Sequence, residues 1–198
     1  FDIKGRLSIH PVNGAPLVGS TRAYAEARAR VAFGLSLFSA GTPMFFMAEE
    51  VGAQKPYRYD TFLAHREDIP GERASAGARM FRFYQDAIRF GRRHPAVRVR
   101  GIDIIHVDGA RRVIAFRRST GSDDLLVVAS FSNRIFDGYA IQSDARRLPD
   151  GSWRELFNSD AALYGGDNVG NLGADVPAAE GRIQVRIPAN GLVVFGRA

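Results

Sequence analysis

The stretch GTPMFFMAEEVG at residues 41–52 joins an apolar run to two adjacent carboxylates and a glycine. Residues 43–47 are too few for a helix and apolar throughout, which is typical of a strand buried on both faces in a parallel sheet. We therefore predict a strand over residues 43–47 that exits at Glu49 and Glu50. Because neighbouring residues of a strand point to opposite sides, these two carboxylates cannot face one reacting bond together.

Helical patterns lie on both sides of this predicted strand. Residues 22–39 are rich in Ala and Leu with apolar side chains at helical spacing, and Ser20 can cap this helix through its hydroxyl. After a polar, aromatic-containing loop at residues 54–73, we predict a second amphipathic helix over residues 75–90. Its apolar face consists of Met80, Phe81, Tyr84, Ala87 and Ile88.

The second half of the chain has the pattern of an all-β domain. Short apolar runs, each bounded by Gly, Pro, Asn or Asp, replace the helical period. The predicted strands are residues 102–107, 113–118, 125–131, 139–141, 153–157, 183–187 and 192–195. Seven short strands with turns between them predict an antiparallel sandwich. We place the domain boundary so that residues 1–97 form the helical part and residues 98–198 the sandwich.

A single strand between helices cannot form a parallel sheet, because its backbone groups stay unpaired on both edges. The chain also begins at Phe1 rather than at a methionine. We therefore expect a piece of a longer protein, with the missing strands upstream. Such a piece exposes apolar surface around residues 31–47, so we expect either self-association or a remodelled N-terminal region.

The composition is that of an ordinary globular protein, with 45% hydrophobic and 24% charged residues. No apolar run approaches the roughly 20 residues of a membrane-spanning helix, and the absence of cysteine fits a reducing compartment. We expect a cytoplasmic location and no membrane association. The net charge of +6 comes from scattered arginines rather than a stripe, so no specific nucleic-acid binding is expected. Because the sequence contains no phosphate loop or zinc signature, we expect neither a cofactor nor a metal.

Three stretches carry a resemblance to one known family. GTPMFFMAEEVG at residues 41–52 resembles the last barrel strand of the α-amylase superfamily of glycosidases and glucanotransferases, with Ala48 where that family usually has glycine. FYQDAIRFGRRHPAVR at residues 83–98 is similar to the helix after it. WRELFNSDAALYGGDNVGNLG at residues 153–173, followed by IPANGLVVF, resembles the C-terminal β domain of 1,4-α-glucan branching enzymes. The last string is the most specific of these matches.

The resemblance implies an α+β fragment, in which the last strand and helices of a (β/α)₈ barrel precede an all-β antiparallel sandwich. It also implies that the parent enzyme cuts an α-1,4-glucan, holds a glycosyl-enzyme ester and passes the chain to a 6-hydroxyl. The partner would be an α-glucan such as glycogen or a maltooligosaccharide. A related α-amylase or trehalose-releasing hydrolase remains open, as does a carbohydrate-binding or structural β-sandwich module.

The same resemblance implies that the catalytic carboxylates are not in this chain. The family uses a carboxylate nucleophile and a carboxylic acid/base, both of which would lie upstream of Phe1. A third carboxylate follows a histidine, and the candidate here is doubtful, because His10 is followed by Pro11 where the carboxylate belongs. We therefore assign no catalytic residue and expect the isolated chain to be inactive.

Residues after the predicted strand are candidates for the rim of a sugar-binding cleft, because barrel sites lie at the C-terminal ends of strands. These candidates are Glu49, Glu50, Gln54, Tyr57 and Tyr59. Two interpretations are open for each of them: contact with sugar, or support of the rim through ion pairs and aromatic packing.

Other residues with suggestive chemistry have structural interpretations. Trp153, the only tryptophan, is predicted to lie in the core rather than to form a sugar platform. Oxygen-bearing residues from Asn158 to Asn171 suggest calcium ligands, but their spacing matches no calcium loop and turn geometry explains them. His94 and His106 lack a partner motif and are predicted to be structural.

Overall fold

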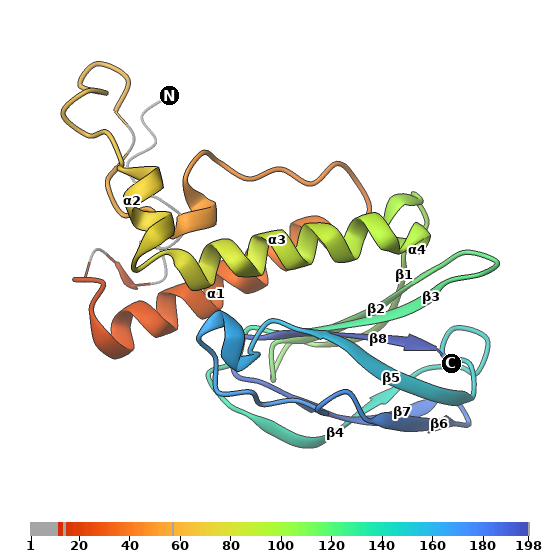
Figure 1. Ribbon diagram of the computed structural model, residues 1–198. Coiled ribbons are helices and arrows are strands. Elements are labelled where there is room, and N and C mark those ends of the chain that lie inside the picture. Colours follow the sequence, from red (N-terminus) through yellow and green to blue (C-terminus); the bar gives the residue numbers. More distant parts are fainter. Residues whose placement is uncertain (1–11, 14, 57, 198) are drawn as a thin grey trace.

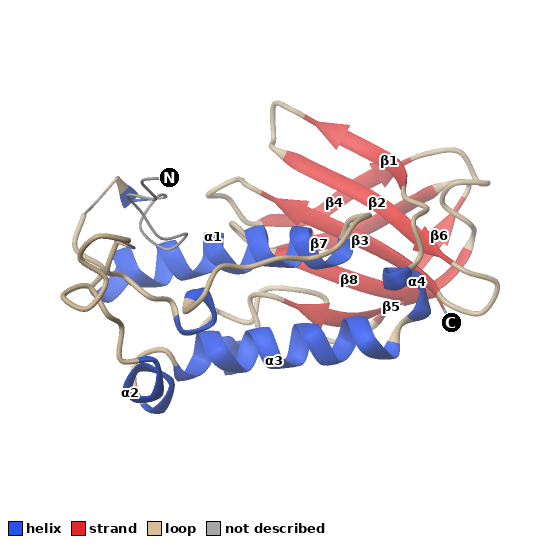
Figure 2. Ribbon diagram, turned by 90° about the horizontal axis from the view of Figure 1, so that it is seen from above, coloured by secondary structure: helices blue, strands red, loops and turns tan. Residues whose placement is uncertain are grey.

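Two long helices pack against one face of an antiparallel sheet in the computed structural model, which describes residues 12–13, 15–56 and 58–197 (Figure 1). Figure 2 shows α1 (Gly19–Phe38) and α3 (Ala78–Arg93) running side by side. The remaining helical pieces are short: η2 (Glu49–Val51), α2 (Ile69–Ala74), α4 (Pro95–Arg98) and η3 (Ala162–Tyr164). No helix among the described residues is long and apolar enough to cross a membrane. The cytoplasmic location stays a prediction.

Helix α1 confirms the first predicted helix, but it begins earlier. Its N-cap residue is Val18, whose carbonyl already accepts the bond from Arg22 N at 3.4 Å. The predicted cap at Ser20 is therefore wrong, because Ser20 lies inside the first turn. The buried side of the helix repeats every four residues, at Ala25, Ala29, Phe33 and Leu37.

The predicted strand at residues 43–47 is wrong. These residues form an irregular extended segment, drawn in orange above α3 in Figure 1. Met44 is 83% exposed, and no strand of the described chain lies alongside to pair with this backbone. Instead, Ser36 Oγ lies 3.3 Å from both the N and the O of Met44, and Phe45 packs edge-on against Phe33 at 5.5 Å.

Helix α3 confirms the second predicted helix with shifted bounds. It buries three of the predicted residues, Met80, Tyr84 and Ala87. It also buries three that the pattern missed: Phe83, Phe90 and Gly91. Ile88, predicted on the same face, is 36% exposed. At the start of the helix, a Cβ on Gly77 would lie 2.4 Å from the backbone O of Val51. Only glycine allows the helix to approach η2 this closely.

The strands form one continuous antiparallel sheet of eight, in the order β1-β2-β3-β8-β5-β6-β7-β4. Their bounds are β1 (Asp103–Asp108), β2 (Val113–Ser119), β3 (Asp124–Ser130), β4 (Phe136–Gln142), β5 (Gly151–Asn158), β6 (Asp175–Ala179), β7 (Arg182–Ile187) and β8 (Leu192–Arg197). Each predicted run overlaps one of these strands, and the runs at 102–107 and 125–131 each extend one residue beyond it. The pattern misses β6, because Pro177 has no N–H to donate and argues against a strand inside a sheet.

The sheet curls so that its two ends meet around a core. β1 and β4 are outermost in the strand order, yet they contact each other, and β4, β6 and β7 form a layer beneath β2, β3 and β8 (Figure 1). Trp153 is fully buried in the enclosed cluster, and its Nε1 donates to Pro149 O at 3.2 Å. Its predicted core position is confirmed. The two layers of the predicted sandwich thus come from a single sheet.

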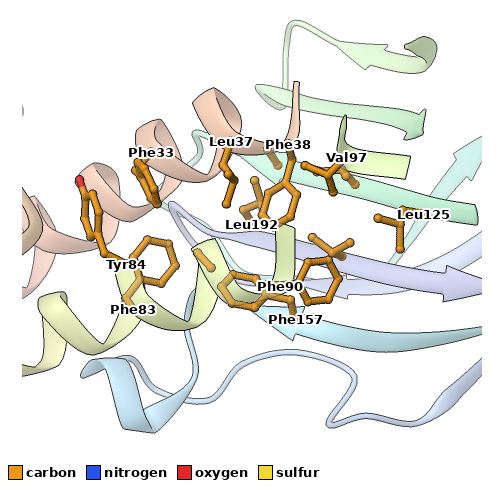
Figure 3. Packing of buried hydrophobic residues seen from close by; sticks show 14 of the residues in the cluster. Phe33, Leu37, Phe38, Phe83, Tyr84, Phe90, Val97, Leu125, Phe157 and Leu192 are labelled. Carbon is orange, nitrogen blue, oxygen red and sulfur yellow. The ribbon is translucent and has the colours of Figure 1, made fainter. Parts of the chain in front are cut away.

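A second hydrophobic cluster fills the space between the outer face of the sheet and the helices (Figure 3). Successive side chains of β3 belong alternately to the two clusters. Leu125, Val127 and Ala129 belong to the outer cluster, and Leu126 and Val128 belong to the enclosed one. Phe157 of β5 extends toward α3, where its ring lies 5.6 Å from Phe90 and 5.8 Å from Phe83. The helical and all-β halves therefore share one core.

Arg118 of β2 joins the helices to the sheet inside this shared interface. Its side chain is 1% exposed and donates to Phe38 O at 2.6 Å, to Val97 O at 3.1 Å and to Val99 O. These carbonyls lie at the C-terminal ends of α1 and α4, where helical carbonyls lack intrahelical partners. The division into residues 1–97 and 98–198 stays a prediction, and Arg118 connects its two parts.

Arg118→Met is expected to lower the free energy of unfolding by about 2–4 kcal/mol, because several buried carbonyls lose a charged donor. Urea unfolding followed by circular dichroism measures this change. Arg154→Met is the control: it removes a strand arginine that is 58% exposed and paired with Asp175, and it should cost less than about 1 kcal/mol. Equal losses in the two variants would contradict the role of Arg118.

Candidate functional site

The rim candidates begin at a tight turn that ends the extended segment of residues 43–47. Ala48 has the left-handed conformation, with φ 72°, which glycine adopts more easily than alanine. Glu49 N donates to Phe46 O at 3.0 Å, and Glu49 Oε2 accepts from Phe46 N at 3.0 Å. The carboxylate of Glu49 therefore closes its own turn.

Beside this turn lie buried polar atoms that have no hydrogen-bond partner among the described residues. They are Glu50 Oε2, Tyr84 Oη and Arg22 Nη2. Burial, and then the charges of Glu49 and Glu50, raise the pKa of Tyr84, so its phenol stays protonated in the field of both carboxylates. A Cβ on Gly52 would lie 3.9 Å from Arg22 Nη2, which places this guanidinium next to η2. Unpaired buried polar atoms are rare, so this is a place where a polar ligand or partner would gain hydrogen bonds.

Two of the remaining candidates, Gln54 and Tyr59, show no hydrogen bond to Glu49 or Glu50 among the described residues. The backbone N of Gln54 donates to Glu67 Oε1 at 2.9 Å, and Tyr59 is 87% exposed. Tyr57 and His10 lie outside the described residues. Contact with sugar stays a prediction for every rim candidate.

Glu67 is a residue of this region that the sequence pattern did not single out. Its Oε1 accepts from the backbone N of Gln54 at 2.9 Å and from that of Lys55 at 2.5 Å. The next residue, Asp68, caps α2, so the predicted loop at residues 54–73 ends in a helix. An aspartate followed by a proline in the first turn is a recognisable helix start, and it would have located α2.

A cavity of about 260 Å³ lies beside the turn. Its lining includes Met47 and Ala48 from the turn and Phe62, His65 and Glu67 from the loop that follows. Neither Glu49 nor Glu50 lines it. The lining also includes Arg58 and Arg66, and its mixture of apolar, imidazole, guanidinium and carboxylate groups is suited to a ligand with both apolar and polar faces.

The Asn- and Asp-rich loop after β5 is held by its own hydrogen bonds. Asn158 Nδ2 donates to Val169 O at 2.9 Å, and Asp160 Oδ2 accepts from Val169 N at 3.0 Å. These contacts support the turn interpretation. Within the part of the chain that the structure describes, no group of three or more His, Cys, Asp or Glu residues is placed to hold a metal ion. His94 is held by Asp123, with its Nδ1 2.9 Å from Oδ1.

The curled sheet matches a known family. Residues 104–198 fit the family described as alpha amylase, C-terminal all-beta domain. The all-β half of the chain belongs to this family. The match begins inside β1 and includes every later strand of this C-terminal domain. The resemblance to the α-amylase superfamily is confirmed.

Branching enzymes are among the curated relatives of this chain. The chain is 36% identical over 154 residues to the 1,4-alpha-glucan branching enzyme GlgB of Rhodopseudomonas palustris (strain HaA2), a match that covers 72% of this chain and 20% of that enzyme. It is 32% identical over 142 residues to the branching enzyme of Bradyrhizobium sp. (strain ORS 278), covering 67% of this chain and 19% of that enzyme. The alignments thus span only about a fifth of these relatives.

Solved structures with the same fold include an alpha-amylase and a debranching enzyme. The alpha-amylase of Geobacillus thermoleovorans, complexed with acarbose, superposes with a TM-score of 0.71 at 9% identity, over 100% of this chain and 37% of that one. The debranching enzyme of Nostoc punctiforme has a TM-score of 0.66 at 17% identity, over 99% of this chain and 34% of that one. At identities this low, the superpositions show the shared fold alone. The shared fold extends over the helices as well as the alpha-amylase C-terminal domain.

Tyr84→Phe is expected to raise the free energy of unfolding by about 1 kcal/mol, because it removes a buried hydroxyl without a partner and keeps the ring stacked on Phe33 at 3.9 Å. Tyr164→Phe is the matched control. Its hydroxyl donates to Asp86 at 3.3 Å, so its loss should lower the free energy of unfolding by about 1 kcal/mol. Urea unfolding measures both, and a destabilised Tyr84→Phe would show that this hydroxyl has a partner.

Proposed function

We propose that this chain is the C-terminal part of a 1,4-α-glucan branching enzyme, which transfers glycosyl chains with retention, and that it carries none of the catalytic carboxylates. The main support for the proposal is the 36% identity to a branching enzyme over 154 residues. That match extends through most of the chain rather than through the all-β domain alone. The substrate of the whole protein would be an α-glucan.

Two described carboxylates near the rim, Glu49 and Glu67, support the placement of catalysis outside this chain. Retaining glycoside chemistry needs two carboxyl groups about 5–5.5 Å apart across the scissile bond. Glu49 instead accepts a backbone N–H of its own turn, and Glu67 accepts two backbone N–H groups of the following loop. Both carboxylates hold backbone in place, which is the work of a supporting rim.

The helical half fits the proposal as the edge of a (β/α)₈ barrel. Residues 43–47 would become the last barrel strand when neighbouring strands pair with their backbone. The exposure of Met44, Phe45 and Met47, at 83%, 40% and 52%, supports this assignment, because apolar side chains of a barrel strand are covered by its neighbours. In the isolated chain the same apolar segment would favour self-association.

A graft tests the proposed function. In the graft, this chain replaces the matching segment of the R. palustris branching enzyme. The hybrid enzyme should be soluble and should form α-1,6 branches at no less than about a tenth of the original rate. The physical reason is that the segment supplies packing surface rather than reacting groups. Branch formation is measured from the fall in iodine staining of amylose and from the α-1,6 anomeric signal in NMR spectra.

The isolated chain and a deletion variant complete this test. Alone, the chain should form no branches and release no reducing ends from amylose. The R. palustris enzyme without the segment should lose solubility or activity. A graft that folds, as judged by circular dichroism and gel filtration, but forms no branches would contradict the proposed function.

A further inference from the structure

A second cavity, of about 410 Å³, opens where β1 and β4 meet as the sheet closes on itself. We call it the seam cavity. It is lined by His106, Asp108 and Arg111, from β1 and the turn after it, and by residues 135–140 at the start of β4. Its volume falls in the range of about 300–1,000 Å³ that is usual for small-molecule sites. It belongs to the all-β domain and shares no lining residue with the cavity beside the rim.

A chain of hydrogen bonds fixes the polar wall of the seam cavity. Tyr139 donates its hydroxyl to Asp108 Oδ2 at 2.9 Å, and His106 Nε2 lies 2.9 Å from the same hydroxyl. Arg111 donates to Asp108 through its backbone N and its Nη1, each at 2.9 Å. Since the single proton of Tyr139 goes to Asp108, Nε2 of His106 is the donor in the second bond. The lining groups are thus held in place before any ligand arrives.

The charges of the seam cavity are paired. The hydrogen bonds from Arg111, backbone first and side chain second, lower the pKa of Asp108 to about 2, so this carboxylate is ionised beside a guanidinium. Burial, and then the bond to Asp108, raise the pKa of Tyr139 to about 12, so its phenol stays neutral. The remaining carboxylate, Asp137, is paired with Arg186 at 2.6 Å. Because Asp108 and Asp137 are each already paired with an arginine, the cavity favours a polar ligand without net charge.

Part of the lining of the seam cavity is apolar. Ile135 is 47% exposed, and Phe136 is half-buried with its ring edge-on to Tyr139 at 5.3 Å. A pyranose has a face of C–H groups that packs on such a surface and a rim of hydroxyls that reaches planar groups such as a guanidinium and a carboxylate. An uncharged polyol with an apolar face is the ligand class that matches both parts of the lining.

We propose that the seam cavity binds a neutral oligosaccharide, so that the all-β domain holds a sugar chain at a site of its own. The identification of this sugar as an α-1,4-glucan rests on the proposed function; the site itself rests on the geometry of His106, Asp108, Arg111, Phe136 and Tyr139.

Titration of the full ¹⁵N-labelled chain with maltoheptaose tests this proposal. The backbone signals of residues 106–111 and 135–140 should shift together along one binding curve, while signals of the rim, residues 48–67, stay within error. Cellotetraose, a β-linked oligomer, should bind at least fivefold more weakly. Shifts confined to the rim would overturn the proposal. So would the absence of saturable shifts at the seam up to about 20 mM sugar, a concentration that corresponds to a binding free energy of only a few kcal/mol.

Two pairs of variants separate the seam cavity from general surface effects. Arg111→Ala should weaken maltoheptaose binding at least fivefold, whereas Arg154→Ala, which also removes an exposed arginine paired with an aspartate, should change it less than twofold. Ile135→Asn should weaken binding similarly, and Leu163→Asn, at a site of comparable exposure, should not. Thermal unfolding of each variant verifies the fold. Unchanged binding in folded Arg111→Ala and Ile135→Asn would overturn the proposal.

The two experiments distinguish the seam site from the branching-enzyme assignment. An active graft together with a chain that does not bind maltoheptaose would reject the seam site and keep the branching-enzyme assignment. An inactive graft together with binding at the seam would keep the oligosaccharide site and reject that assignment.

Discussion

The buried guanidinium of Arg118 is the interaction on which the joint between helices and sheet depends. A charge inside a protein is tolerated only where its donors find acceptors. Here the acceptors are the backbone carbonyls of Phe38, Val97 and Val99, which lie at helix ends and carry the negative end of the helix dipole. The two Nη groups of Arg118 and the carbonyls satisfy one another, whereas its buried Nε has no partner among the described residues. The bonds from the Nη groups fix the ends of α1 and α4 against β2. The outer hydrophobic cluster then fills the space around this joint.

The rim and the seam cavity differ in how their polar groups are satisfied. At the rim, Glu50 and Tyr84 have buried atoms without partners among the described residues, and the segment before them has no neighbouring strand. At the seam, Asp108, Arg111 and Tyr139 are already bonded to one another. The rim can therefore form further hydrogen bonds when protein or ligand is added. The polar side chains of the seam cavity are preorganised, so they lose little conformational entropy when a ligand binds.

Local patterns located most elements, and the misses have specific physical causes. The period of apolar residues located α1 and α3, and alternation around Trp153 placed that ring in the core. β6 was missed because Pro177 opposes a strand in isolation, although the neighbouring strands accommodate it here. At the candidate site, the sequence pattern singled out Glu49 and Glu50 as candidates but not Glu67, since a carboxylate that accepts backbone N–H groups from another part of a loop leaves no periodic signal.

The sequence by itself determined the helices, most of the strands and the family of the all-β domain, because these depend on neighbours a few residues away and on specific strings such as that at residues 153–173. Only the tertiary structure decided that residues 43–47 are not a strand, since a strand exists only when another backbone pairs with it. The tertiary structure also created the seam cavity. Tyr139 is 31 residues from Asp108 and 33 from His106, and these side chains meet because the sheet curls until β1 reaches β4.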